Sequence, residues 1–160
     1  MSARILVVDD KRDLARGVAL VLGKLPAEIA IAYSAEEALE RLEQNPADVV
    51  LSDIRMPGRD GLSLLDCVRE RWPQARVILF TGYGTIDSAV DAMKRGAFDY
   101  LTKPFNNDEL LVVTKRALNE IQDEQEIARL RAELRRTYDF HSIYSRDRHF
   151  EAVPHLKRFV

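Results

Sequence analysis

The stretch Val50-Leu-Ser-Asp-Ile-Arg-Met-Pro-Gly58 carries one acidic residue, Asp53, from the end of an apolar run into a loop. The apolar run at residues 49–51 is short and unbroken, which is typical of a strand buried on both faces of a sheet. Pro57 and Gly58 indicate the turn that follows. Because ligands bind at the carboxyl ends of strands in open α/β sheets, Asp53 occupies a position where a chemical role is expected.

The composition of the 160-residue chain, 46% hydrophobic and 31% charged, predicts one full globular domain with an additional segment. The net charge of −2 includes no basic excess, so we expect no direct binding of nucleic acid. The single cysteine, Cys67, excludes an internal disulfide. No apolar run approaches membrane-spanning length and no charged leader precedes one, so we expect a cytoplasmic protein without membrane association.

Short apolar runs alternate with amphipathic helical patterns along the chain. The predicted strands cover residues 5–8, 28–33, 49–51, 76–80 and 97–101. The predicted helices cover residues 14–25, 34–45, 60–72, 86–96 and 107–137, with Ser34 spelling a capping box and Gly96 a helix end. Parallel neighbours need crossover connections, so this alternation predicts an α/β fold with a doubly wound parallel sheet and a long C-terminal helix.

Five polar residues follow the ends of the predicted strands: Asp9, Asp10, Asp53, Thr81 and Lys103. In a parallel sheet they would share one rim. Three acids near one point repel each other and recruit a cation, and oxygen ligands together with a phosphate select Mg²⁺. A lysine and a hydroxyl beside them predict a site for a transferring phosphoryl group, with the Asp53 carboxylate as nucleophile.

Each of these residues also has a structural interpretation. The acidic pair could cap the first helix, Asp53 could be a turn residue, Thr81 could cap a helix, and Lys103 could be a solvated surface amine. If the structural interpretations were right, four unrelated roles would have to coincide at the ends of different strands. We therefore favour the phosphoryl site.

The chain resembles the receiver domains of bacterial two-component response regulators over about residues 4–120. The resemblance rests on five motifs in order: Asp9-Asp10, Asp53 with Met56-Pro57-Gly58, Thr81-Gly82, Tyr100, and Lys103-Pro104. It implies a flavodoxin-like (βα)5 fold with strand order 2-1-3-4-5. It also implies that a sensor histidine kinase phosphorylates Asp53.

The resemblance further implies roles for individual residues. Mg²⁺ would be held by Asp10, Asp53 and the backbone carbonyl of Arg55, with Asp9 acting chiefly through water. The Lys103-Pro104 bond is expected to be cis.

Two more expectations concern the surroundings of the site. Tyr100 would be a switch residue that turns into the space left by Thr81, although strand tyrosines also pack without such a role. The side chains of Arg55 and Tyr83 would flank the phosphoryl group and set how fast water removes it, or would be surface residues only.

The segment Gly82-Tyr-Gly-Thr-Ile-Asp-Ser-Ala-Val90 resembles the corresponding segment of one subgroup, the nitrogen-regulator type that drives sigma-54 transcription. There a helical linker joins the receiver to an ATPase and a DNA-binding domain. We predict a receiver at 1–120, a coiled-coil linker at 121–137 and a tail at 138–160 that either begins an ATPase domain or is a disordered stub. No phosphate-loop motif is present, so no nucleotide hydrolysis is assigned.

The last predicted helix carries two apolar stripes in different phase. The first contains Leu111, Thr114, Leu118 and Ile121, and the second contains Ile127, Leu130 and Leu134. The shift predicts that the helix packs on its own domain first and on a partner later. We favour a homodimer through the linker helix and the face formed by residues 86–101 and the start of the last helix, over a lone extended helix.

These observations predict a phosphorylation-dependent switch that changes dimer geometry to control a transcription-activating output. Two other classes stay open. Haloacid-dehalogenase phosphatases also use an aspartate nucleophile, Mg²⁺, a threonine and a lysine, although their nucleophile follows the first strand. A dimerising adaptor that no longer depends on phosphorylation is the third class.

Overall fold

Strands and helices alternate along the chain in this computed structural model, which describes residues 3–82 and 86–147. The strands are β1 (Ala3–Val8), β2 (Ala27–Ala32), β3 (Val49–Asp53), β4 (Arg76–Thr81) and β5 (Asp99–Thr102). The helices are α1 (Arg12–Leu22), α2 (Ala35–Gln44), α3 (Gly61–Arg71), α4 (Ile86–Lys94) and α5 (Asn107–Asp147).

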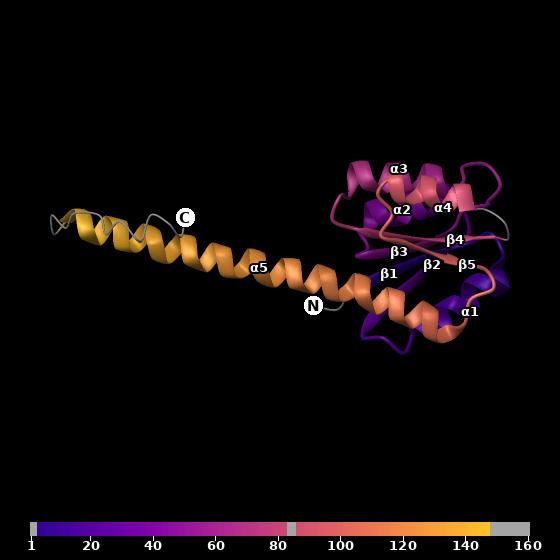
Figure 1. Cartoon of the computed structure of the whole chain (residues 1–160), viewed down its shortest axis with the longest axis horizontal. Coiled ribbons are helices and arrows are strands. Elements are labelled where there is room, and N and C mark those ends of the chain that lie inside the picture. Colours follow the sequence, from indigo (N-terminus) through magenta and orange to yellow (C-terminus); the bar gives the residue numbers. More distant parts are fainter. Residues whose placement is uncertain (1–2, 83–85, 148–160) are drawn as a thin grey trace. The chain divides into compact units, whose positions relative to one another are not determined.

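All strand pairs are parallel, and the sheet has the order β2-β1-β3-β4-β5 (Figure 1). This confirms the predicted doubly wound fold and its flavodoxin-like strand order. The central strand β3 is buried along its whole length, which explains why its sequence is an unbroken apolar run instead of an alternating one.

Two apolar cores lie on the two faces of the sheet. The helices α2, α3 and α4 cover one face, and α1 and the first turns of α5 cover the other (Figure 1). The first core includes Leu42, Leu64 and Leu79, and the second includes Leu22, Phe80 and Leu110. Helices on both faces leave the carboxyl ends of the strands as an accessible rim, where the sequence predicts the site.

Predicted helix signals are present at their positions. The Ser34 hydroxyl accepts a hydrogen bond from the Glu37 amide at 3.1 Å, and the Glu37 carboxylate accepts one from the amide of Tyr33 at 3.1 Å. The Asp60 carboxylate caps α3 by accepting from the Ser63 amide at 2.8 Å. Gly96 follows α4 with a φ of 97°, a conformation that side-chain-bearing residues rarely adopt.

Two predicted helix ends were wrong. Helix α1 ends at Leu22, before Leu25-Pro26, because Gly23 opens a series of turns in which the Leu25 amide donates to the Leu22 carbonyl at 2.9 Å. Helix α5 continues past Thr137 to Asp147, since no proline or glycine stands between residues 107 and 147 to end it. The first ten residues of the predicted tail are therefore helical, and 148–160 lie outside the described residues.

The chain forms two compact units, residues 1–121 and 122–160. In the second unit, the described part of α5 exposes Ile127, Leu130 and Leu134, with exposed fractions of 48%, 45% and 59%. In the same segment Arg129 pairs with Glu126 and Glu133, and its hydrogen bond lowers the pKa of the Glu126 carboxyl. Within the described residues, no helix combines the length and apolar character needed to cross a membrane. The domain boundaries at 120 and 137 stay predictions.

Candidate functional site

Strand register brings the predicted site residues to one edge of the sheet. Val8 is opposite Ser52, Asp53 is opposite Phe80, and Thr81 is opposite Thr102. The strands therefore end nearly level. Because of this alignment, the residues that end or follow four strands, which are Asp9, Asp10, Asp53, Thr81 and Lys103, come to the same rim although they lie up to 94 positions apart.

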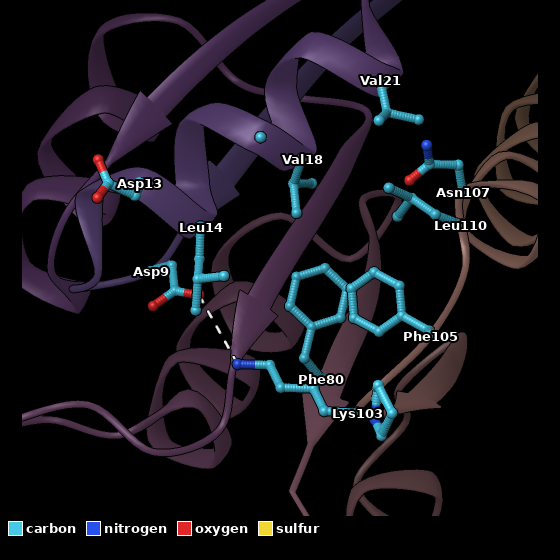
Figure 2. A pocket seen from close by; sticks show the side chains of 12 residues that line it. Asp9, Asp13, Leu14, Val18, Val21, Phe80, Lys103, Phe105, Asn107 and Leu110 are labelled. Atoms are coloured by element: carbon cyan, nitrogen blue, oxygen red, sulfur yellow. Dashed lines mark ion pairs between the residues drawn. The ribbon is translucent and has the colours of Figure 1, made fainter.

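Lys103 joins two of the buried carboxylates. Its Nζ atom lies 2.9 Å from Oδ2 of Asp53 and 3.9 Å from Oδ2 of Asp9 (Figure 2 shows the second pair). Asp53 and Asp9 are only 6% and 2% exposed, whereas the Lys103 side chain is 25% exposed. The single positive charge of Lys103 therefore offsets only part of the negative charge of these two nearly buried carboxylates.

The three acids form a group that could hold a cation. One carboxylate oxygen from each of Asp9, Asp10 and Asp53 lies within 4.8 Å of the others. Among the described residues, Oδ1 of Asp10 is buried without a hydrogen-bond partner. Oxygen ligands with an unsatisfied buried carboxylate suit a hard divalent ion such as Mg²⁺.

The pKa of the Asp9 carboxyl is raised above its usual value. The main cause is burial, which disfavours the charged form, and the charges of Asp53 and Asp10 act in the same direction. The amide of Lys11, which donates to Asp9 Oδ1 at 3.0 Å, and the charge of Lys103 oppose the rise. Burial and the two neighbouring carboxylates thus both disfavour the charged form of Asp9.

The backbone around Asp53 is held by two residues that sequence reasoning missed. The Ser52 hydroxyl, fully buried, donates to the Asp53 carbonyl at 2.9 Å. A side chain on Gly61 would put its Cβ 2.3 Å from that same carbonyl oxygen, so only glycine permits α3 to start here. A glycine in the first turn of a helix is unfavourable for the helix, and this could have been the signal.

The remaining predicted residues have different environments. Thr81 is buried and its hydroxyl donates to the Leu101 carbonyl at 3.4 Å. The Tyr100 side chain is 38% exposed, outside the acidic group. The Arg55 amide donates to Asp53 Oδ1 at 3.3 Å, which brings its backbone to the site. Tyr83 lies outside the described residues.

The peptide bond between Lys103 and Pro104 is cis, which confirms that expectation.

The response regulator receiver domain family matches residues 5–115 of this chain. The chain is 40% identical over 115 residues to a putative NtrX-like response regulator of Rickettsia bellii, covering 71% of this chain and 24% of that protein. It is 48% identical over 90 residues to the transcriptional regulator NtrC of Escherichia coli, covering 56% of this chain and 19% of that protein. The chain thus spans about a quarter of the length of the first of these curated relatives.

Solved structures give the same result. The crystal structure of the receiver domain of NtrX from Brucella abortus superposes with a TM-score of 0.69 at 39% identity, covering 72% of this chain and 98% of that chain. The predicted similarity to nitrogen-regulator-type proteins is therefore confirmed, and the comparison covers the receiver part of those proteins.

Proposed function

Because the chain belongs to the response regulator receiver domain family, we propose that it is a signalling switch that accepts a phosphoryl group on Asp53 from a sensor histidine kinase. Receiver domains are signalling modules and not enzymes in the usual sense. The observation that carries the proposal is the 2.9 Å contact between Lys103 Nζ and Asp53 Oδ2 beside two further acids. A buried carboxylate with one cation and an incomplete ligand set is suited to accept a phosphoryl group.

In the transfer, an Asp53 carboxylate oxygen forms the new bond to phosphorus. The bond from phosphorus to the donor, a phosphohistidine nitrogen or the bridging oxygen of acetyl phosphate, breaks with its electron pair leaving on the donor. Lys103 and the Thr81 hydroxyl then contact phosphoryl oxygens, which requires Thr81 to give up the Leu101 carbonyl. Attack of water on the acyl phosphate later returns the free carboxylate.

Mg²⁺ would be held by Asp10, Asp53 and the backbone carbonyl of Arg55, with Asp9 acting through water. When bound, it supplies positive charge that offsets the negative charge of the transferring group. Among the described residues, Oδ1 of Asp10, which has no hydrogen-bond partner, supports this assignment because it is free to bind a cation. The raised pKa of Asp9, caused mainly by burial and further by the charges of Asp53 and Asp10, supports it as well, because a cation would stabilise the charged form.

The switch links the phosphoryl group to a surface. When Thr81 moves toward the phosphate, Tyr100 turns into the space that it leaves, and the face of α4, β5 and α5 changes. That face exposes Val90 (47%), Met93 (43%) and Val112 (59%), which the sequence pattern alone would bury in part. Moving a two-state equilibrium from mostly off to mostly on requires ~5 kcal/mol, a value that several charge-assisted hydrogen bonds can reach.

The output is a change in dimer geometry. The exposed apolar stripe of Ile127, Leu130 and Leu134 supports a coiled-coil homodimer through the linker helix, since spacings of three and four residues give one helical face. The chain spans about a quarter of the length of its Rickettsia bellii relative, and we propose that the dimer passes the signal to a transcription-activating output. The phosphatase and the phosphorylation-independent adaptor are the alternatives.

The experiment uses the whole chain with Mg²⁺ and either beryllofluoride or acetyl phosphate. Mass spectrometry detects one phosphoryl group after acetyl phosphate, and small-angle scattering follows dimer geometry with beryllofluoride. Asp53→Asn is the inactive control, and Asp60→Asn is the matched control because Asp60 lies in the same loop and caps α3.

We expect a response in the wild type and in Asp60→Asn, and none in Asp53→Asn. Identical scattering of wild type and Asp53→Asn under all conditions would contradict the phosphorylation-dependent switch and would favour the phosphorylation-independent adaptor. Sustained turnover of a small phosphate ester would favour the phosphatase.

A further inference from the structure

A pocket of about 580 Å³ lies between α1 and the start of α5 and borders the acidic group, with which it shares Asp9. This volume is in the range of sites that bind small organic molecules, roughly 300–1,000 Å³. Figure 2 shows Val18 and Val21 of α1 beside Asn107 and Leu110 of α5, with the rings of Phe80 and Phe105 below them in the view.

The walls favour a flat apolar body. The rings of Phe80 and Phe105 stack with centroids 5.0 Å apart and an interplanar angle of 28°. Leu14 is 46% exposed at the edge of the pocket, although a leucine on the inner stripe of α1 would ordinarily be covered. Gly17 adds open space, since a Cβ placed there would meet no atom within 4 Å. An aromatic ring would fill this space and cover Leu14.

The charges of the lining favour a cation. Among the described residues, the ionisable ones that line the pocket are the acids Asp9 and Asp13 and the base Lys103, which leaves an excess of one negative charge. Lys103 is already engaged by Asp53 and Asp9, at 2.9 and 3.9 Å. Asp13 makes no ion pair among the described residues. The neighbouring Arg12 guanidinium lies over the Tyr33 ring at 4.1 Å and not at the pocket.

We propose that this pocket binds a small organic monocation with an aromatic body, its ring against Phe105 and its cationic nitrogen toward Asp13. The amide of Asn107 offers a hydrogen bond to a neutral substituent at the other end of the ligand. A ligand anion would instead meet the excess negative charge of the lining, so charge complementarity selects the cation.

Lys103 belongs both to this lining and to the ion pair with Asp53. Ligand occupancy therefore has a direct route to the state of Asp53, a link that rests on the proposed phosphorylation of that residue. By thermodynamic reciprocity, a phosphoryl analogue on Asp53 must change the affinity of the pocket if the link exists.

The test is a titration of the ¹⁵N-labelled whole chain with 2-naphthylmethylammonium, followed by amide chemical shifts. We expect shifts confined to the segments that line the pocket, which are residues 9–21, Phe80 and residues 103–110. The affinity for the matched anion 2-naphthylacetate should be at least about ten-fold lower than the affinity for the cation. Equal or tighter binding of the anion, or shifts centred elsewhere, would overturn the proposal.

Two variants test the residues. Gly17→Leu fills the pocket and should weaken binding of the cation at least about ten-fold, because the added side chain occupies the ligand's space. Asp13→Asn should weaken it about two- to five-fold, with Asp123→Asn on the linker as the unchanged control. Unaltered affinity in Gly17→Leu, in a variant that unfolds at the wild-type temperature, would refute the site. Shifts at α1 that depend on protein concentration without ligand would instead assign the groove to a second copy.

Repeating the titration with Mg²⁺ and beryllofluoride tests the link to Asp53. A changed affinity in the wild type and none in Asp53→Asn supports it. Unchanged affinity in a protein whose Asp53 amide does respond to beryllofluoride overturns the link. If no residue responds to beryllofluoride, the proposed function fails, and the first titration by itself still decides whether the pocket binds the cation.

Discussion

Lys103 and Asp53 lie fifty positions apart in the sequence, yet the lysine Nζ and a carboxylate oxygen of Asp53 are 2.9 Å apart. The contact exists because β3, β4 and β5 are consecutive neighbours in the sheet, so that their carboxyl ends share one rim. It also links the acidic group to the end of β5, where Thr102 is opposite Thr81 of β4. Perturbing this pair should therefore affect stability, cation binding and signalling together.

Replacing Lys103 should expose the repulsion among the buried acids. We expect Lys103→Met to lower the free energy of unfolding by about 1–3 kcal/mol in the presence of EDTA, because Asp53 and Asp9 lose their shared cation. Added Mg²⁺ should then stabilise the variant more than the wild type. Urea unfolding measures both effects, and Lys115→Met, at an exposed position of α5, is the control. Equal losses in the two variants would contradict the prediction.

Neutralising Asp9 should stabilise the protein that lacks a metal ion. The pKa of Asp9 is higher in the folded state than its ordinary 3.8, so its ionisation costs folded-state stability as the pH rises through the interval between the two values. The advantage of Asp9→Asn over wild type should therefore be absent at low pH, grow across this interval and level off above it.

The measurement is urea unfolding in EDTA at several pH values, with Asp13→Asn on the exposed part of α1 as the comparison. A difference between Asp9→Asn and wild type that shrinks as the pH rises would have the wrong sign for a raised pKa.

Adding one methyl group to Gly61 should be costly. Its Cβ would lie 2.3 Å from the Asp53 carbonyl oxygen, so the start of α3 or the Asp53 backbone must shift. We expect Gly61→Ala to lose about 2 kcal/mol of stability and to slow phosphorylation by acetyl phosphate. Gly17→Ala is the matched control, since its Cβ meets no atom within 4 Å in α1, and it should gain about 0.5–1 kcal/mol. A neutral Gly61→Ala would argue against the tight approach.

The linker stripe should control dimerisation without affecting the receiver unit. We expect simultaneous replacement of Ile127, Leu130 and Leu134 by glutamine to weaken self-association at least about ten-fold, because each loses apolar area that a partner helix would cover. Sedimentation velocity gives the association constant, and thermal unfolding reports the receiver. The double variant Arg131→Gln/Arg135→Gln keeps the stripe and serves as the control. Unchanged association would leave the homodimer without its proposed interface.

Local sequence patterns were sufficient to predict the order of strands and helices in this protein and to identify the candidate site residues. Short apolar or alternating segments of three to six residues indicated every strand, and the capping box at Ser34 indicated a helix start, because these signals depend on chain neighbours alone. The helix ends near Leu22 and Asp147 were less predictable, since several local alternatives have similar free energies there.

Around Asp53, the sequence by itself determined which acid stands at the end of a buried strand and which distant residues could join it. Only the tertiary structure decided that Ser52 and Gly61 hold its backbone, that Asp10 keeps an unpartnered oxygen, and that Leu14 borders a pocket. The physical reason is that these features depend on distances between atoms from different elements, which packing fixes to tenths of an ångström and which no periodicity along the chain records.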